Sequence, residues 1–115
     1  MSYVDGFVVP VPAGKKEAYR TAAAKAQQVF RDHGATRVVE CWGDDVPDGK
    51  VTDFKRSVKA DGDEVVVFSW VEWPDKATRD AGQKKVMEDP RMQDPDMPFD
   101  GQRMIWGGFD VMLDG

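Results

Sequence analysis

The feature that most constrains the fold is an almost unbroken apolar run, Glu-Val-Val-Val-Phe-Ser-Trp-Val-Glu-Trp, at residues 64–73. Valine, phenylalanine and tryptophan favour strands, and a strand with apolar side chains at odd and even positions is covered on both faces. Pro74 ends the run. The chain must therefore build a sheet with this strand near its centre and cover both faces of that sheet.

Three further runs are rich in strand-forming residues and lie at residues 3–11, 35–43 and 104–112. Residues 14–33 repeat apolar side chains every three or four positions, and Gly34 follows as a stop signal, which predicts the clearest helix. Asp75 is a good N-cap for a second helix that runs to about Glu88, before Pro90. The apolar stripe of this second helix is poor, so it should bury only a narrow ridge.

The connections are polar, and one of them is ambiguous. Polar loops are expected at residues 44–50 and 91–103. Residues 52–60 favour a short helix capped by Thr52, although Phe54 and Val58 would also suit a brief edge strand.

The order strand, helix, strand, strand, helix, strand predicts an α+β, ferredoxin-like βαββαβ antiparallel sheet with both helices on one face. Residues 1–115 are expected to form a single domain of this kind. Because the strands carry apolar side chains on both sides, the helix-free face also needs cover. A second copy is the simplest cover, so we expect a homodimer whose sheets pack face to face with tryptophans near the interface.

Charge and cysteine content narrow the partners and the compartment. The net charge of −5 gives a field that repels phosphate backbones and anionic lipid, so we expect neither nucleic-acid nor membrane binding. No apolar run approaches the roughly 18 residues of a membrane span, and the N-terminus does not resemble a signal peptide. The lone Cys41 cannot form an intrachain disulfide, which agrees with a cytoplasmic location.

The sequence offers little for metal or cofactor chemistry. One histidine and one cysteine are too few for a zinc-type site within one chain, so we expect no metal and no cofactor. His33 ends the first predicted helix, where it should cap the last carbonyl groups. Cys41 is expected to be an inert core thiol.

Two carboxylates lie in unusual places. Asp5 and Glu40 fall inside predicted strands among apolar neighbours, where burial would raise a carboxyl pKa. Each should either have a cationic partner, for which Arg37 and Arg103 are candidates, or act as a catalytic acid or base. If each carboxylate has a cationic partner, it forms a buried or interfacial salt bridge and has no catalytic role.

The predicted strands also carry all four tryptophans. An aromatic wall suits a planar ligand, so Trp42, Trp70 and Trp106, with Arg37 and Arg103, are the candidate ligand-binding residues. The alternative interpretation places these tryptophans in the core and the dimer interface.

Several segments resemble the YbaA-like bacterial family. They are Tyr3-Val4-Asp5-Gly6-Phe7-Val8-Val9, Val39-Glu40-Cys41-Trp42, Asp45-Val46-Pro47-Asp48-Gly49-Lys50, Phe68-Ser69-Trp70 and the block from Met97 to Phe109. The resemblance implies membership of the dimeric α/β barrel superfamily, in agreement with the topology above. That superfamily holds small cofactor-free monooxygenases, haem-linked enzymes, isomerases and stress-related binding proteins, so fold alone does not choose a function.

Two hypotheses about function remain open. The first is a structural or small-molecule-binding homodimer without turnover. The second is a cofactor-independent enzyme, monooxygenase-like or isomerase-like, that acts on a small aromatic or polyketide-like molecule with Glu40 or Asp5 as the base. A closed, solvent-free barrel centre would favour the first, and an open pocket with a carboxylate and an aromatic wall would favour the second.

Overall fold

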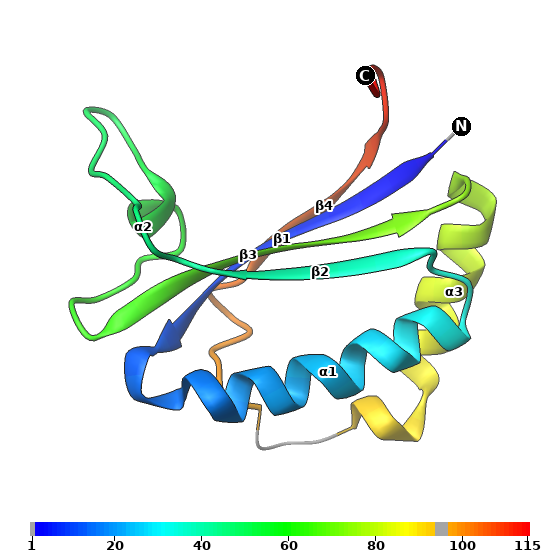
Figure 1. Cartoon of the computed structure of the whole chain (residues 1–115), viewed down its shortest axis with the longest axis horizontal. Helices are drawn as coiled ribbons and strands as arrows, with labels where there is room; N and C mark the ends of the chain where they lie inside the picture. The colour runs from blue at the N-terminus through cyan, green and yellow to red at the C-terminus, as the bar shows by residue number, and fades with distance from the viewer. Residues whose placement is uncertain (1, 94–96) are drawn as a thin grey trace.

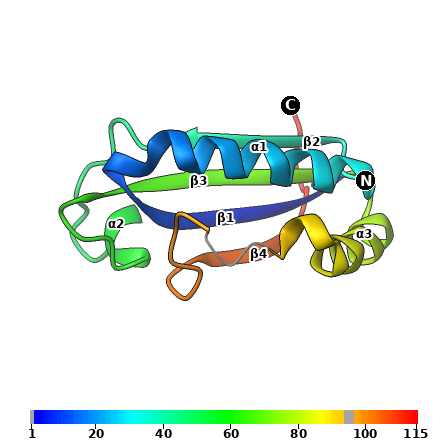
Figure 2. The ribbon, with the colours of Figure 1, turned by 90° about the horizontal axis from the view of Figure 1, so that it is seen from below.

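The computed structural model describes residues 2–93 and 97–115. One antiparallel sheet holds four strands in the order β2-β3-β1-β4. In chain order these are β1 (Tyr3–Pro12), β2 (Arg37–Trp42), β3 (Glu64–Trp73) and β4 (Ile105–Asp110). The two long helices, α1 (Lys16–Asp32) and α3 (Lys76–Glu88), lie on one face of the sheet (Figures 1 and 2). The expected ferredoxin-like α+β fold is therefore confirmed.

Short elements complete the chain between these strands and helices. The 3-10 turns η1 (Ala13–Lys15) and η2 (Pro90–Met92) flank the long helices, and η2 lies at the start of what was expected to be loop. The short helix α2 (Phe54–Ser57) is the favoured outcome for residues 52–60. Its cap is Asp53, whose side chain accepts a hydrogen bond from the Arg56 backbone N–H, so the assignment of the cap to Thr52 is wrong.

The helix ends follow the sequence signals. Gly34 has a φ of 110°, a left-handed conformation that favours glycine, and it lets the chain turn away after α1. Asp75 accepts a hydrogen bond from the backbone N–H of Thr78 at 2.7 Å and so caps α3 as expected. The buried ridge of α3 is narrow and consists of Gly82 and Val86.

The strand register divides the sheet into two faces. Alternate residues of β1, β2 and β3 point toward the helices and build the core. The core contains two clusters, one around Tyr3, Val38, Val71 and Trp73 and the other around Val9, Val11, Tyr19, Ala23 and Val67.

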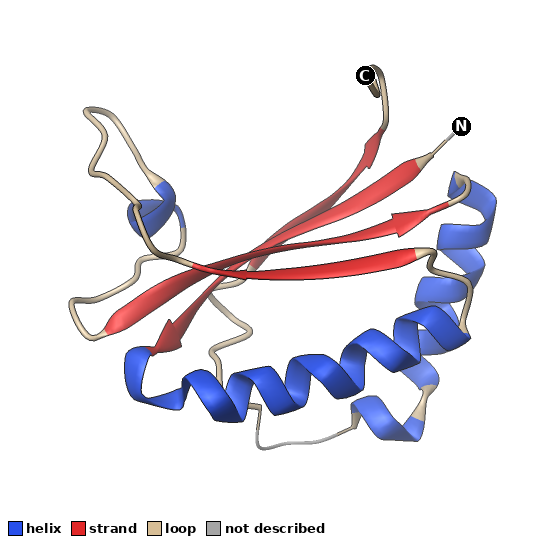
Figure 3. Cartoon of the chain, viewed as in Figure 1, coloured by secondary structure: helices blue, strands red, loops and turns tan. Residues whose placement is uncertain are grey.

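The opposite, helix-free face is apolar and open. We call it the outer face; a hollow of about 630 Å³ on it is lined by Val4, Gly6, Phe7, Val8, Phe68, Trp70, Ile105, Trp106, Gly107 and Phe109. Phe68, Ile105 and Phe109 are 42%, 46% and 62% exposed. The long connection between β2 and β3 and the C-terminal tail both rise on this side of the sheet (Figure 3). The second apolar face expected from the strand sequences is therefore present.

Candidate functional site

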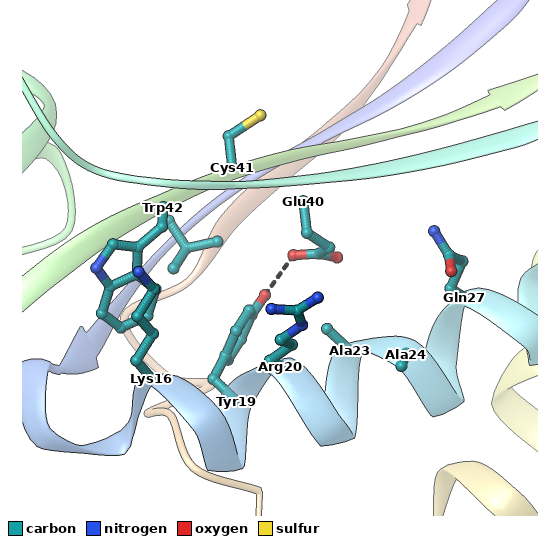
Figure 4. A pocket seen from close by; sticks show the side chains of 10 residues that line it. Lys16, Tyr19, Arg20, Ala23, Ala24, Gln27, Glu40, Cys41 and Trp42 are labelled. Atoms are coloured by element: carbon teal, nitrogen blue, oxygen red, sulfur yellow. Dashed lines mark hydrogen bonds between the residues drawn. The ribbon is translucent and has the colours of Figure 1, made fainter.

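A pocket of about 450 Å³ lies between α1 and the edge strand β2 (Figure 4). We call it the vestibule; it is lined by Lys16, Tyr19, Arg20, Ala23, Ala24, Gln27, Glu40, Cys41, Trp42 and Val67. The helical period places the α1 residues on one side of that helix. The alternation of β2 points Glu40 and Trp42 toward the helices, opposite Ser69 and Val67 of β3.

A carboxyl-hydroxyl pair forms the polar centre of the vestibule. The Tyr19 hydroxyl donates a 2.6 Å hydrogen bond to Oε1 of Glu40. Tyr19 is buried, and desolvation together with the charge of Glu40 raises the pKa of its hydroxyl far above the ordinary value. Tyr19 therefore stays protonated and remains a donor at neutral pH.

The carboxyl group of Glu40 has a higher pKa than that of a surface glutamate. Glu40 lies on an edge strand and is exposed as a residue, yet desolvation is the largest influence on its carboxyl group and raises its pKa. Hydrogen bonds from Tyr19 and Ser69 oppose this shift without cancelling it. The carboxyl group is thus a better proton acceptor than an ordinary glutamate.

A second cavity of about 340 Å³ lies deeper, between the sheet and both long helices. We call it the inner chamber. Its lining is Phe7, Val9, Tyr19, Ala26, Phe30, Val38, Glu40, Ser69, Val71, Gln83, Val86, Met87, Met92, Met97, Phe99, Met104 and Trp106. Among the described residues, Tyr19 and Glu40 alone line both cavities. The hydrogen-bonded pair therefore stands between a polar vestibule and an apolar chamber.

Asp5 lies outside both cavities and is already fully paired. Its carboxylate is buried, with Arg79 donating to both oxygens at 2.7 to 3.1 Å and the Trp73 indole donating at 2.9 Å. The cation beside Asp5 is Arg79 of α3, so the suggestion that Arg37 or Arg103 pairs with Asp5 is wrong. This geometry matches a buried salt bridge that ties α3 to β1.

The two arginines expected to bind ligand lie elsewhere. Arg37 is 3.6 Å from the carboxylate of Glu72, and Arg103 contacts Glu64 at 2.7 Å and Asp100 at 2.9 Å. Neither Arg37 nor Arg103 lines the vestibule or the inner chamber.

The structure separates the three candidate tryptophans. Trp42 lines the vestibule, whereas Trp70 lies on the outer face and donates to Glu72 at 2.9 Å. Trp106 stacks on Phe7, with ring centroids 6.2 Å apart, and borders both the inner chamber and the outer hollow. Of the seven candidate residues, only Glu40 and Trp42 share the vestibule.

His33 and Cys41 also differ from expectation. The His33 ring contacts Asp89 at 2.9 Å rather than the helix carbonyls, and its backbone N–H bonds to Val29 and Phe30 instead. Cys41 is exposed, so its assignment to the core is wrong. The side chain of Cys41 lies on the other side of β2 from those of Tyr19 and Glu40, as Figure 4 shows. Within residues 2–93 and 97–115 no three His, Cys, Asp or Glu side chains group as metal ligands.

The sequence did not predict Lys16, Tyr19 or Arg20 as site residues. Tyr19 falls in the apolar stripe of the first predicted helix, but a buried tyrosine hydroxyl needs a partner, and that need is a usable signal. Lys16 and Arg20 flank Tyr19 one helical turn apart, but the sequence alone does not distinguish them from the solvated charges of the same helix. Whether Lys16 and Arg20 line a pocket depends on which face of α1 lies against the edge strand β2, and the local sequence does not determine this.

Fold and site together define a class, the ferredoxin-like α+β domains with a pocket between the sheet and the first helix. Within it, the chain belongs to the DUF1428 family, described as proteins of unknown function, whose model matches residues 2–101. It is similar to proteins named "Uncharacterized protein YbaA" in Escherichia coli K12 and Shigella flexneri. Each of these proteins is 61% identical to this chain over 116 residues, and the match spans 99% of this chain and 99% of the relative. The family resemblance inferred from the sequence is therefore confirmed.

Solved structures support the fold. An uncharacterized NIPSNAP domain protein from Burkholderia xenovorans superposes with a TM-score of 0.60 at 18% identity, covering 95% of this chain and 93% of that one. A putative antibiotic biosynthesis monooxygenase from Nitrosomonas europaea gives a TM-score of 0.54 at 15% identity, covering 96% and 90%. At these identities the likeness concerns the fold alone.

The described part of the chain contains no helix with the length and apolar character needed to cross a membrane.

Proposed function

We propose that this chain is a cytoplasmic, homodimeric small-molecule-binding protein, formed by a single domain of residues 1–115, that holds its ligand in the vestibule. The observation that carries the proposal is the Tyr19–Glu40 hydrogen bond, which lies where the vestibule meets the apolar inner chamber. Small-molecule sites combine mostly apolar walls with a few placed polar groups. The ring of Trp42 offers a flat wall, and the carboxyl-hydroxyl pair offers the polar anchor.

The proposed homodimer is supported by the outer face. Its hollow is lined almost entirely by apolar side chains, four of which are 42% to 62% exposed. Two such faces packed about a twofold axis would bury on the order of 1,500 Å² or more, the size of a stable interface. A second copy supplies a complementary apolar surface without any further partner.

The binding proposal is tested by native mass spectrometry of protein purified from its host. We expect a co-purifying organic molecule in the wild-type chain, and we expect Trp42→Ala to lose it. Lys15→Ala, an exposed position outside the vestibule, is the matched control and should retain the molecule. A wild-type chain that carries no molecule and gains no thermal stability from a library of small aromatic compounds would contradict the proposal.

A second candidate function is a cofactor-independent enzyme acting on a small aromatic or polyketide-like molecule. The raised pKa of the Glu40 carboxyl group, in an open pocket with an aromatic wall, favours this alternative. Ionised Glu40 would accept a proton from an acidic C–H group of the ligand, and the electron pair would stay on the ligand carbon. With a ligand in hand, Glu40→Gln should abolish deuterium exchange at that carbon while the ligand still binds. Unchanged exchange in this variant would exclude Glu40 as the base.

A further inference from the structure

The mouth of the vestibule carries two cations that form no ion pair with any residue that the structure describes. Lys16 and Arg20 lie one turn apart on α1, on either side of Tyr19, and both are exposed (Figure 4). None of the ion pairs among the described residues involves either of them. By contrast, Arg79 and Arg103 each hold two carboxylates. Lys16 and Arg20 are therefore available to a ligand.

One of these cations lies directly beside the aromatic wall. The Lys16 Nζ atom is 5.6 Å from the centroid of the Trp42 ring, within the range of a cation–π contact. A flat ligand placed against Trp42 would bring any acidic substituent close to this ammonium group. The Gln27 amide is oriented by one of its two N–H groups, which donates to the backbone carbonyl of Val38 at 2.9 Å.

The charge of the vestibule is opposite to that of the whole chain. Two cations, Lys16 and Arg20, against one carboxylate, Glu40, leave a net charge of +1 when Glu40 is ionised. The protein as a whole carries −5 and repels anions. A positive pocket on an acidic protein selects anions at this one place.

We propose that the vestibule binds flat organic anions, that is, small aromatic carboxylates or similar acids. The aromatic body lies against Trp42, and the acidic group is held by Lys16 and the planar guanidinium of Arg20. Glu40 has about four acceptor positions, and because Tyr19 and Ser69 use two of them, a hydroxyl or amine of the ligand can donate to another. This inference rests on the proposed binding function and names the ligand class.

Two fluorescent probes that differ by one acidic group test the charge preference. The anionic probe is 8-anilinonaphthalene-1-sulfonate, and the neutral probe is N-phenyl-1-naphthylamine. We expect Arg20→Gln and Lys16→Gln each to weaken binding of the sulfonate about fivefold, and to leave binding of the neutral probe within about twofold. Lys15→Gln is the matched control and should change neither affinity. Added salt should weaken only the sulfonate, because ions screen exposed charges.

The outcomes separate this inference from the proposal beneath it. If Trp42→Ala weakens both probes but the charge variants leave sulfonate binding unchanged, the vestibule binds ligands and the anion preference is overturned. An equal loss of both probes in the charge variants overturns it as well. If Trp42→Ala affects neither probe, the vestibule is not the binding site and the proposed function also fails. Because Lys16 and Arg20 are exposed, their variants should fold, which circular dichroism verifies.

Discussion

At the scale of single residues, two carboxylates of similar sequence context have opposite environments. Asp5 is buried and its oxygens are occupied by Arg79 and Trp73, so its negative charge is a fixed part of the core. Glu40 contacts a neutral hydroxyl, and desolvation raises the pKa of its carboxyl group. A carboxylate held by a cation stabilises the fold, whereas one held by a hydroxyl remains available for proton exchange.

The raised pKa of Glu40 should be visible in how the stability of the protein depends on pH. The folded pKa of Glu40 is raised above the ordinary 4.5, so its contribution to stability is present below that pH and is lost as pH rises through the raised pKa. The glutamine of Glu40→Gln cannot ionise, so this variant does not lose stability through residue 40 as pH rises. We therefore expect the thermal stability of E40Q relative to wild type to increase as pH rises through the same window. Thermal unfolding across pH measures the difference.

Tyr19→Phe gives an independent check on the same window. This variant removes the hydrogen bond that stabilises the ionised carboxylate, so it should move the window to higher pH. A stability difference between E40Q and wild type that stays constant with pH would show that the Glu40 pKa is not shifted.

Asp5→Asn should be strongly destabilising. The change leaves the guanidinium of Arg79, which is only 13% exposed, without its buried partner. Breaking a buried pair in this way costs about 3–5 kcal/mol. Urea unfolding measures the free energy, and Arg79→Met in the Asp5→Asn background should restore part of it. A loss below about 1 kcal/mol would mean that water reaches Arg79 and replaces the carboxylate.

At the scale of elements, α3 is held by close approach rather than by apolar area. A Cβ atom added at Gly82 would overlap the carbonyl oxygen of His33 and the ring of Trp73. The helix therefore lies directly against the end of α1 and the last residue of β3. This contact explains how a helix with a poor apolar stripe still joins the core.

Gly82→Ala should destabilise the protein against the trend of helix propensity. Alanine is favoured over glycine by about 1 kcal/mol inside an exposed helix, but overpacking here should cost about 1–3 kcal/mol more than that gain. Gly14→Ala is the control, because a Cβ atom there meets nothing within 4 Å. Chemical denaturation of both variants measures the effect, and a stabilised G82A would show that α3 can move outward freely.

Much of the element order could be predicted, because it depends on local patterns. The bounds of β3 agree with the apolar run at residues 64–73, and Gly34 and Asp75 mark helix ends as their chemistry requires. The vestibule could be predicted only in part. Glu40 and Trp42 were accessible through strand alternation, whereas the pairing of Asp5 with Arg79 joins residues 74 positions apart and has no local signature.

At the scale of the whole molecule, the outer face is flanked by two projections. The connection that contains α2 rises at one end of the sheet, and the C-terminal tail rises at the other (Figure 1). Phe54 of α2 packs edge-on against Phe68, with ring centroids 6.0 Å apart, so the apolar surface continues onto this connection. Met112 and Leu113 in the tail are 92% and 88% exposed. A second copy seated between the projections would meet apolar side chains at both ends.

The proposed dimer should depend on the outer face. Light scattering at micromolar concentration should give twice the single-chain mass of 12.9 kDa. Phe109→Glu places a charge on an outer-face side chain and should give the single-chain mass without unfolding. Met87→Glu, an exposed apolar residue of α3 on the helix side, is the control and should leave the mass doubled. A wild-type mass near 12.9 kDa would refute the dimer.

The lone cysteine supplies a second measurement of the same interface. Cys41 is exposed in the single chain and pairs across the strands with Phe68, which places it on the outer face. Its alkylation by a maleimide should be slow in the wild-type dimer and fast in Phe109→Glu. Equal rates in the two proteins would place the interface away from β2.

The position of β1 in the sheet has a consequence for synthesis of the chain. This first strand lies between β3 and β4, so Tyr3 pairs with Trp73 on one side and with Asp110 on the other. The first strand to be synthesised therefore cannot form all of its backbone hydrogen bonds until the last strand has been synthesised. During translation, its unpaired N–H and C=O groups are open to other chains until β4 has left the ribosome. Translation rate and chaperone supply, more than the stability of the finished fold, should then govern the yield of correctly folded protein.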